Sequence, residues 1–294
     1  MPRRAEMPMD EHAADDRAWI GRSETDEDVA LRAPAMRLAA TLDRTDLIAR
    51  LEAPGATLPP CWHWLYFLPR APQSTLGRDG HPQRGGLLPP VALPRRMWAG
   101  SRLEFRAPIA FGAALARTST IAGVENKSGR SGALTIVTVR HEIRADSALA
   151  VVDEHDIVYR EAPAPGGSAA ARSEAAPRAA HFRRTVVPDP VLLFRYSALT
   201  FNGHRIHYDR DYAVGVEGYP GLVVHGPLQA TLLLDLLDRE RPGARVARFA
   251  FRATAPLFDT APFDVCGARD GGRVRLWTLT PDGCIAMDAT ADIA

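Results

Sequence analysis

The stretch GPLQATLLLDLLDRE, residues 226–240, decides the fold of this chain. Residues 228–237 within it are apolar on almost every side, which is typical of a helix that is buried all round. Pro227 follows Gly226, and proline is favoured at the first helical position because its missing N–H would have no partner there. The stretch therefore predicts a buried helix that begins near Gly226 and is wrapped by a sheet.

The residues after this helix have the pattern of antiparallel strands. Residues 246–293 consist of short alternating apolar runs that are separated by turns such as RDGGR at 269–273. Residues 101–143 repeat the plan, with the turn NKSGRSG at 126–132, and they also follow a helical stretch, residues 30–43. A helix followed by antiparallel strands, twice in one chain, predicts a duplicated α+β unit.

The repeat also sets the expected domain boundaries. LEFRAPI at 103–109 in the first unit parallels FAFRATAPL at 249–257 in the second. Residues 162–180 are small, rich in Pro, Gly and Ser, and lack bulky apolar side chains, which is typical of a mobile linker. We therefore predict a flexible tail over 1–15, an N-terminal unit over 16–161, a linker over 162–180 and a C-terminal unit over 181–294.

Composition excludes several classes of protein. The formal net charge is +1, so no overall field attracts nucleic acid or an anionic membrane. Cys61, Cys266 and Cys284 lie far apart without a CxxC pair, which excludes a disulfide scaffold and a standard zinc site and fits a reducing cytoplasm. We find neither the apolar region of a secretory signal nor an apolar stretch long enough to span a bilayer. We expect a cytoplasmic globular protein without a nucleic-acid or membrane partner.

A cluster of proton-handling side chains precedes the buried helix, in YSALTFNGHRIHYD at residues 196–209. Apolar residues interleave with the polar ones, which favours a partly buried segment over a solvated loop. Two histidines three residues apart, with His225 as a third ligand, could hold a metal. Histidine also titrates nearest to neutral pH, which suits acid–base chemistry, and we favour that interpretation.

These residues resemble the hydratase motif of the MaoC-like acyl-CoA hydratases and dehydratases. That motif runs Tyr-x-x-x-(Ser/Thr)-Gly-Asp-x-Asn-Pro-(Leu/Ile)-His-x-Asp and is followed by a step into a central helix, here VVHGP at 223–227. The segments HWLYFLP at 63–69, RMWAG at 96–100 and VVDEHDIVYRE at 151–161 resemble the N-terminal domain of the two-hot-dog branch. The resemblance implies an α+β double hot-dog fold, in which two antiparallel sheets each wrap a central helix.

The resemblance also implies roles for single residues. His207 takes the place of the catalytic histidine, whereas Asn202 stands where the family has its catalytic aspartate. An amide can orient a water but cannot take its proton. Either His207 is the sole base and Asn202 positions the water, or His204 shares the work. Gly226 takes the place of the residue whose N–H polarises the thioester carbonyl. The residues expected to bind the substrate are Tyr196, Thr200, Arg205 and His225.

The implied function is the reversible hydration of a 2-enoyl-CoA, or the dehydration of a 3-hydroxyacyl-CoA. Mesaconyl-C4-CoA and itaconyl-CoA lead as substrates, and a general 3-hydroxyacyl-thioester dehydratase comes second. Arg205 is the candidate partner for the free carboxylate of a dicarboxylic acyl group, with the CoA phosphates as competing ligands. A non-catalytic acyl-CoA-binding protein and a thioesterase are the alternatives from other classes.

The N-terminal unit is expected to be catalytically silent. It has GLLPPVAL at 86–93 where the C-terminal unit has VVHGP, and its helical stretch holds neither His nor Asn. The aromatic segment at 61–67 is interpreted as core packing, with a lid or wall over the acyl chain as the alternative, and His63 within it as a buried structural histidine. We expect an acyl-CoA partner without a metal or cofactor, and a homodimer or higher homo-oligomer is compatible with the sequence.

Overall fold

The structure of the protein is a computed structural model that describes residues 16–83, 85–129, 132–161 and 179–294. The predicted tail, residues 1–15, and residues 162–178 of the predicted linker lie outside the described residues.

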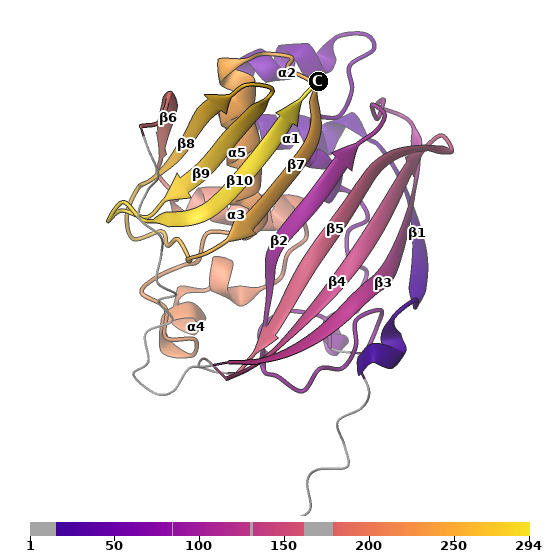
Figure 1. The fold of residues 1–294 in the computed structure, drawn as a ribbon, viewed down its shortest axis with the longest axis vertical. Coiled ribbons are helices and arrows are strands. Elements are labelled where there is room, and N and C mark those ends of the chain that lie inside the picture. Colours follow the sequence, from indigo (N-terminus) through magenta and orange to yellow (C-terminus); the bar gives the residue numbers. More distant parts are fainter. Residues whose placement is uncertain (1–15, 84, 130–131, 162–178) are drawn as a thin grey trace, which may run out of the picture.

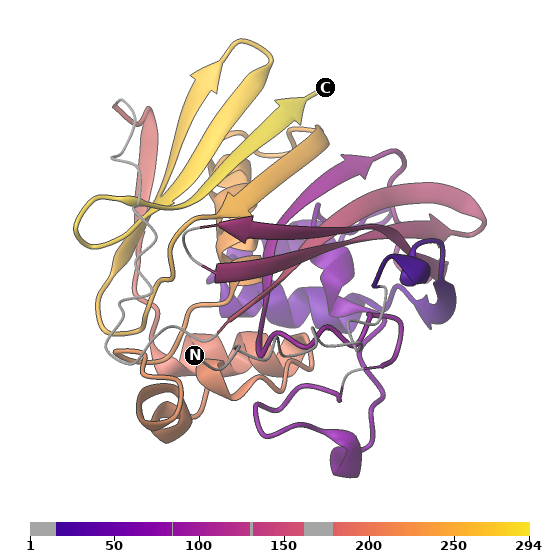
Figure 2. The same cartoon turned by 60° about the horizontal axis from the view of Figure 1, so that its bottom comes forward.

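One antiparallel sheet of ten strands forms one layer of the molecule, and the helices lie on its inner side (Figures 1 and 2). The strands stand in the order β1-β3-β4-β5-β2-β7-β10-β9-β8-β6. Their bounds are β1 Ser23–Val29, β2 Arg95–Phe105, β3 Ala114–Gly129, β4 Gly132–Ala145, β5 Ala148–Arg160, β6 Phe182–Val186, β7 Val246–Ala253, β8 Phe263–Asp270, β9 Arg273–Leu279 and β10 Ile285–Ile293. The helices are α1 Arg32–Thr41, α2 Thr45–Glu52, α3 Pro190–Leu199, α4 Arg210–Gly215 and α5 Gly226–Glu240, with short 3₁₀ helices η1 Asp16–Trp19, η2 Trp62–Leu65, η3 Gln73–Thr75 and η4 Arg205–His207.

The two halves of the chain meet where β2 pairs with β7. In that pairing Leu103 lies opposite Phe249, so the two stretches that match in sequence are neighbours at the centre of the sheet. Counted outward from this junction, both halves have the same strand order. The predicted double hot-dog fold is confirmed, with its two sheets joined edge to edge into one.

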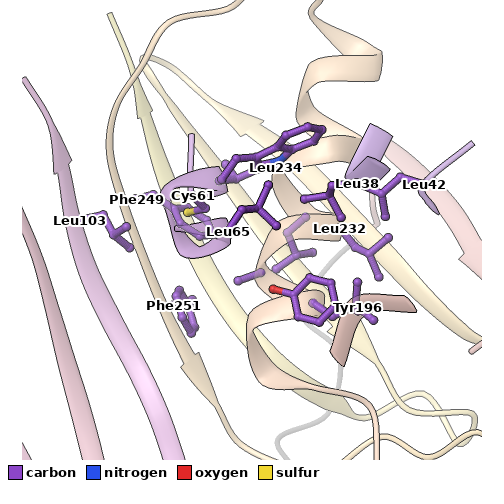
Figure 3. Close-up of a cluster of buried hydrophobic side chains, with 14 of the residues drawn as sticks. Leu38, Leu42, Cys61, Leu65, Leu103, Tyr196, Leu232, Leu234, Phe249 and Phe251 are labelled. Atoms are coloured by element: carbon purple, nitrogen blue, oxygen red, sulfur yellow. The ribbon is translucent and has the colours of Figure 1, made fainter. Parts of the chain in front are cut away.

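The helix α5 forms the centre of the C-terminal half, as the sequence predicts. All residues from Leu228 to Leu237 are buried, and α5 packs against β8, β9 and β10. Burying each leucine side chain contributes about 1.5–3 kcal/mol, so the run of leucines supplies much of the driving force for this half. Figure 3 shows how this core joins segments far apart in the chain, with Leu38, Leu65, Leu103, Leu232, Leu234 and Phe249 in one cluster.

The N-terminal half is built differently under its sheet. Its helices α1 and α2 have 10 and 8 residues, compared with 15 in α5. The helix α1 packs against α2 and α3. The segment around η2 covers the inner face of these strands, where Trp64 reaches Asp153 on β5. This arrangement leaves room for a large cavity between the halves.

The order of elements differs from the sequence-based expectation in one respect. A strand, β1 or β6, precedes the helices in each half, whereas we expected each half to begin with a helix. The sequence of β1, SETDEDV, does not read as a strand because four of its seven residues are Asp or Glu, which are depleted in sheets. Its seven residues nevertheless pair with β3, at the edge of the sheet, where charged side chains are common.

A buried ion-pair network fastens the two halves to each other. The guanidinium of Arg44, 1% exposed, donates to Asp235, to Asp238 at 2.6 Å and to Asp46 at 2.7 Å. Because Asp235 and Asp238 belong to α5, this arginine ties the N-terminal helices to the central helix. Within the described residues, no helix has the length and apolar character needed to cross a membrane.

Candidate active site

A cavity of about 1280 Å³ lies between the two halves and receives side chains from both. The N-terminal half contributes residues on β2, β4 and β5, and the C-terminal half contributes the predicted motif; the wall includes Trp98, His141, His155, Tyr196, Asn202 and Pro227. A smaller cavity, of about 590 Å³, lies beside Leu237 and Asp238 toward the other end of α5. Tyr196, Thr200, Asn202 and Arg205 of the motif line the larger cavity, so we place the chemistry there.

Local hydrogen bonds fix the conformation of the motif between the end of α3 and the cavity wall. Thr200 closes α3 by donating its hydroxyl to the carbonyl of Tyr196 at 2.8 Å. Phe201 then turns the chain with a φ of 48°, and Asn202 N–H donates to the carbonyl of Ser197 at 2.8 Å. The side-chain oxygen of Asn202 accepts from the backbone N–H of His204 at 3.0 Å. Asn202 and Thr200 both line the cavity, and Thr200 also ends the helix.

His207 is fixed as a neutral imidazole with one free nitrogen. Its Nδ1 donates to the carbonyl of Val223 at 2.7 Å, and because a carbonyl only accepts, the lone pair resides on Nε2. Burial lowers the pKa of His207 from 6.5 to about 4, and the nearby His81 adds to the shift. At neutral pH His207 is therefore uncharged and able to accept a proton.

His225 lies behind His207. The two rings stack with centroids 3.7 Å apart, and His225 Nε2 is 2.8 Å from the Ser197 hydroxyl. His225 is 1% exposed, and its Nδ1 is buried without a hydrogen-bond partner among the described residues. Its burial places it where it supports the ring of His207, and its predicted role in binding the substrate stays a prediction.

Gly226 begins α5, and the next residue, Pro227, lines the cavity. As the first helical residue its N–H has no partner within the helix, and the positive end of the helix dipole adds to its field. A Cβ on Gly226 would lie 3.8 Å from the carbonyl oxygen of Trp98 on β2. Such a donor can stabilise a carbonyl oxygen that gains negative charge, and the oxyanion role of Gly226 stays a prediction. Tyr196, 2% exposed, lines the cavity beside it.

Arg205 is already occupied by partners within the protein. Its Nε and Nη2 donate to Asp209 at 2.9 and 2.7 Å, and its Nη1 donates to the carbonyl of Arg78 at 3.1 Å. The guanidinium also lies 4.2 Å from the ring centroid of Tyr212. This geometry argues against Arg205 as the partner of a substrate carboxylate, because the fork that would bind it holds Asp209 instead.

The sequence analysis missed two residues of the site, Asp79 and His81. They come from a loop of the N-terminal half, and the ring of His81 lies 4.1 Å from that of His204. His204 in turn is 5.4 Å from His207, so histidines 81, 204, 207 and 225 form a continuous series of rings. The only local signal was an Asp-Gly turn followed by a histidine. Residues 79, 81 and 204 also bring ligand atoms within 4.8 Å of one another and offer the donor types of a zinc site.

A second buried polar cluster lies on the inner face of the N-terminal half. Asp153 accepts hydrogen bonds from His155 at 2.7 Å, from Trp64 at 2.9 Å and from His63 at 3.2 Å. Burial acts to raise the pKa of Asp153, but His155 and His63 hold it well below its usual range. His63 is buried, as expected. Next to this cluster, His141 is 4.4 Å from His155 in ring-centroid distance, so the cavity wall here is polar.

Comparisons with known proteins show the family of this chain. The family described as hydroxyacyl-thioester dehydratase type 2 matches residues 61–259. The mesaconyl-C(4)-CoA hydratase of Chloroflexus aurantiacus is 50% identical over 281 residues, 96% of this chain and 99% of that protein. The mitochondrial hydroxyacyl-thioester dehydratase type 2 of Schizosaccharomyces pombe is 28% identical, covering 85% of this chain and 91% of that protein. A solved MaoC-like dehydratase from Phytophthora capsici has a TM-score of 0.68 at 15% identity and covers 93% of this chain and 96% of its own, a likeness in fold.

Proposed function

Because the chain belongs to the hydroxyacyl-thioester dehydratase type 2 family of MaoC-like hot-dog proteins, we propose that it reversibly hydrates a short dicarboxylic 2-enoyl-CoA. The chain is a hydro-lyase of acyl thioesters, as its family and both relatives are named for hydratase or dehydratase activity. Mesaconyl-C4-CoA leads as substrate because the 50% identical relative is a hydratase of that thioester. Itaconyl-CoA and a plain 3-hydroxyacyl thioester follow.

The observation that carries the proposal is the placement of a neutral histidine beside a helix N-terminus. As the oxygen of water bonds to C3, Nε2 of His207 takes its proton, and Asn202 orients the water. The electron pair of the C2–C3 double bond moves toward the thioester oxygen, which Gly226 N–H stabilises at the positive end of α5. The resulting enolate collapses when C2 takes up a proton.

The polar inner wall supports a dicarboxylic acyl group over a long alkyl chain. Ser119, His141, Asp153 and His155 are all buried or half-buried and face the same region, with the Ser119 hydroxyl 2.8 Å from His141 Nδ1. An alkyl chain placed against these groups would displace the water around them without offering other hydrogen-bond partners, and that costs free energy. A short acyl group with a polar far end avoids that penalty.

Arg117 is the proposed partner of the far carboxylate. It lies on β3 at the cavity wall, and its Nε is buried without a hydrogen-bond partner among the described residues. Its Nη2 is 3.8 Å from Asp26, at the outer limit of an ion pair, and its guanidinium packs 4.8 Å from the ring centroid of Phe67. A buried donor without an acceptor is unfavourable, and a carboxylate bound there would supply the acceptor.

A substrate panel tests the proposed function. The purified chain is mixed with mesaconyl-C4-CoA, itaconyl-CoA or crotonyl-CoA, and the loss of enoyl-thioester absorbance is followed. We expect the highest kcat/KM with mesaconyl-C4-CoA. If the chain hydrates none of the three thioesters, the proposal is refuted. Release of free CoA would instead identify a thioesterase.

A reducing cytoplasmic location and a homo-oligomeric state are part of the same proposal. The cysteines are free thiols, two buried and one half-buried, which fits a reducing compartment. Light scattering of the purified chain would measure the oligomer directly.

A further inference from the structure

Two cavities follow one another along the inner face of β5. Alternate residues of a strand face the same side and lie about 6.6 Å apart. On this face Val151 lines the smaller cavity, whereas Asp153, His155 and Ile157 line the larger one, in which we place the chemistry. The change from one cavity to the other therefore occurs within a single step along the strand, at Asp153.

His63 lies at this boundary. Among the described residues it is the only one that lines both cavities, and its side chain is 4% exposed. Its Nε2 donates to the Asp153 carboxylate at 3.2 Å, so the imidazole is held at the same point of β5 at which the cavities change. One buried side chain thus separates the larger cavity from the smaller one.

The segment around η2 is fixed in a backbone conformation that is unfavourable at both of its ends. Cys61 has a φ of 68° and Phe67 a φ of 56°, in the left-handed region that residues other than glycine rarely adopt. The Tyr66 hydroxyl donates to the carbonyl of Leu31 at 2.6 Å, and Phe67 N–H donates to Asp28 at 2.7 Å. Such conformations persist only where the surrounding structure enforces them. The segment is therefore a rigid wall.

This wall lies close to the position of the reacting carbons. Trp98 is next to the predicted oxyanion donor, because a Cβ on Gly226 would lie 3.8 Å from the Trp98 carbonyl oxygen. The ring of Trp64 lies 5.1 Å from that of Trp98, and the ring of His63 lies 5.5 Å from that of Trp64. An acyl chain that runs from Gly226 toward β5 therefore has little room before it meets the imidazole.

The smaller cavity, behind His63, suits an alkyl chain. Its volume of about 590 Å³ is several times that of a four-carbon chain. Apolar side chains line most of it, among them Leu51, Leu58, Trp62, Phe105, Val151 and Leu237. Four of its charged side chains, Arg44, Arg50, Asp235 and Asp238, are paired with one another, so an apolar ligand would leave none of these four without a partner.

We infer that His63 is a specificity-determining residue, which closes the acyl compartment and limits the substrate to short acyl chains. The inference rests on the proposed hydratase function and deepens it, because it names the side chain that excludes longer substrates. The excluded class is the medium-chain 2-enoyl-CoA, whose alkyl end would need the space of the imidazole and the smaller cavity behind it. The segment at 61–67 is in this way the wall over the acyl chain.

Removal of the imidazole breaches the wall without loosening it. In a His63→Ala variant, Asp153 still accepts from His155 at 2.7 Å and from Trp64 at 2.9 Å, so its carboxylate keeps two partners. The hydrogen bonds of Tyr66 and Phe67 do not involve His63. The variant therefore joins the two cavities while the backbone of the segment keeps its position.

The selectivity for acyl chain length tests the inference. The kcat/KM values of the wild-type chain and of His63→Ala are measured with crotonyl-CoA and trans-2-octenoyl-CoA, from the loss of enoyl-thioester absorbance. The wild-type chain should favour crotonyl-CoA. Each buried methylene is worth about fourfold in binding, so His63→Ala should raise kcat/KM for octenoyl-CoA relative to crotonyl-CoA by at least about tenfold. Unchanged selectivity in the variant, or a wild-type chain that hydrates both thioesters equally well, would overturn the inference.

Two variants separate the bulk of His63 from its other properties. His63→Leu keeps a side chain of similar volume without the hydrogen bond, and it should retain the selectivity of the wild-type chain. Leu58→Ala enlarges only the smaller cavity and leaves His63 in place, so its selectivity should also be that of the wild-type chain. If either variant gains turnover of octenoyl-CoA, the imidazole is not what closes the compartment.

Refilling the smaller cavity tests where the longer chain goes. Val151→Phe, added to His63→Ala, places a ring in that cavity, and the gain with octenoyl-CoA should disappear. A double variant that keeps the gain would show that the chain does not enter the smaller cavity, against the inference. His63→Ser, whose hydroxyl can still donate to Asp153, is measured in parallel so that the comparison does not depend on the folding of one variant.

Binding measurements keep this inference separable from the proposed function. If the wild-type chain hydrates no enoyl-CoA, the hydratase function fails, and calorimetric titration with butyryl-CoA and octanoyl-CoA still measures the limit on chain length. In that assay His63→Ala should gain affinity for octanoyl-CoA relative to butyryl-CoA by at least about tenfold. No gain in either assay, with an active wild-type hydratase, defeats only the role of His63.

Discussion

The imidazole of His207 lies on the imidazole of His225, with the two planes inclined by only 19°. Two stacked rings in one buried site repel each other when both are charged, and burial lowers the pKa of both histidines. His225 is also bonded to the Ser197 hydroxyl, which fixes the orientation of its ring. The stacking therefore holds His207 as an uncharged base on a rigid support.

The first prediction concerns the acid limb of the pH profile. The pKa of His207 is lowered to about 4, so the base becomes protonated, and kcat/KM falls, only as the pH drops toward that value. With an unshifted histidine the fall would begin near pH 6.5. Initial rates with mesaconyl-C4-CoA between pH 4 and 8, corrected for any loss of folded protein, measure the limb. A midpoint near the unshifted value would assign the base to a group other than His207.

The second prediction compares two changes at Asn202. Its side-chain oxygen accepts from His204 N–H, and an aspartate can make the same bond and also accept a proton. We expect Asn202→Asp to retain activity and Asn202→Ala to lose much of it, because alanine leaves the water without an orienting group. Steady-state kcat of the two purified variants decides between them. Full activity in Asn202→Ala would show that the water is oriented by other groups.

The parts of the fold that follow from local pattern were predictable from the sequence. The apolar run of α5 and the matched strands β2 and β7 carry the hot-dog architecture, and the structure confirms both. The strand β1 was missed because its acidic sequence has no apolar alternation, and only its pairing with β3 makes it a strand. Strand pairing between distant segments is a tertiary property that local propensity does not contain.

Some residues of the candidate site could likewise be predicted from the sequence, and others could not. His207, Asn202 and Gly226 were predictable because one continuous motif and one helix start hold them. Asp79 and His81 were not, since they reach the site through backbone contacts between two loops more than 100 residues apart in the sequence. No periodicity of the sequence indicates such a contact. The two glycines at which the loops touch, Gly80 and Gly203, can be recognised only once the structure is known.

The third prediction concerns stability. Arg44→Ala removes the buried guanidinium that joins Asp235 and Asp238 on α5 to the N-terminal helices. Breaking a buried pair by removing one partner costs about 3–5 kcal/mol, and we expect the lower end because Arg239 still contacts Asp235 at 2.8 Å. Urea unfolding measures the change. Arg70→Ala, which breaks an ion pair whose arginine is 72% exposed, is the control and should cost no more than about 1 kcal/mol. Equal midpoints for the two variants would contradict the role of Arg44.

The last prediction concerns the far carboxylate of the substrate. Arg117 has a buried Nε without an acceptor among the described residues, whereas the fork of Arg205 is filled by Asp209. Asp26 is the competing acid beside Arg117, but at 3.8 Å it leaves the guanidinium able to bind a second carboxylate. Removing Arg117 should therefore harm only substrates that carry that group. We expect Arg117→Ala to lower kcat/KM for mesaconyl-C4-CoA by about 10-fold to 100-fold relative to crotonyl-CoA, the worth of about 1.4–3 kcal/mol from a charged hydrogen bond.

Arg205→Ala is the matched variant for this test, because it removes an arginine of the same cavity wall. Its loss frees Asp209 and should affect the two thioesters alike, through the shape of the motif or the binding of CoA. Arg117→Lys separates charge from geometry, since lysine keeps the positive charge but lacks the planar fork, and we expect it to recover part of the selectivity. If Arg117→Ala reduces turnover of both thioesters equally, Arg117 does not bind the carboxylate. The polar wall around His141 and Ser119 would then have to supply neutral donors in its place, and variants at those two residues would carry the same comparison.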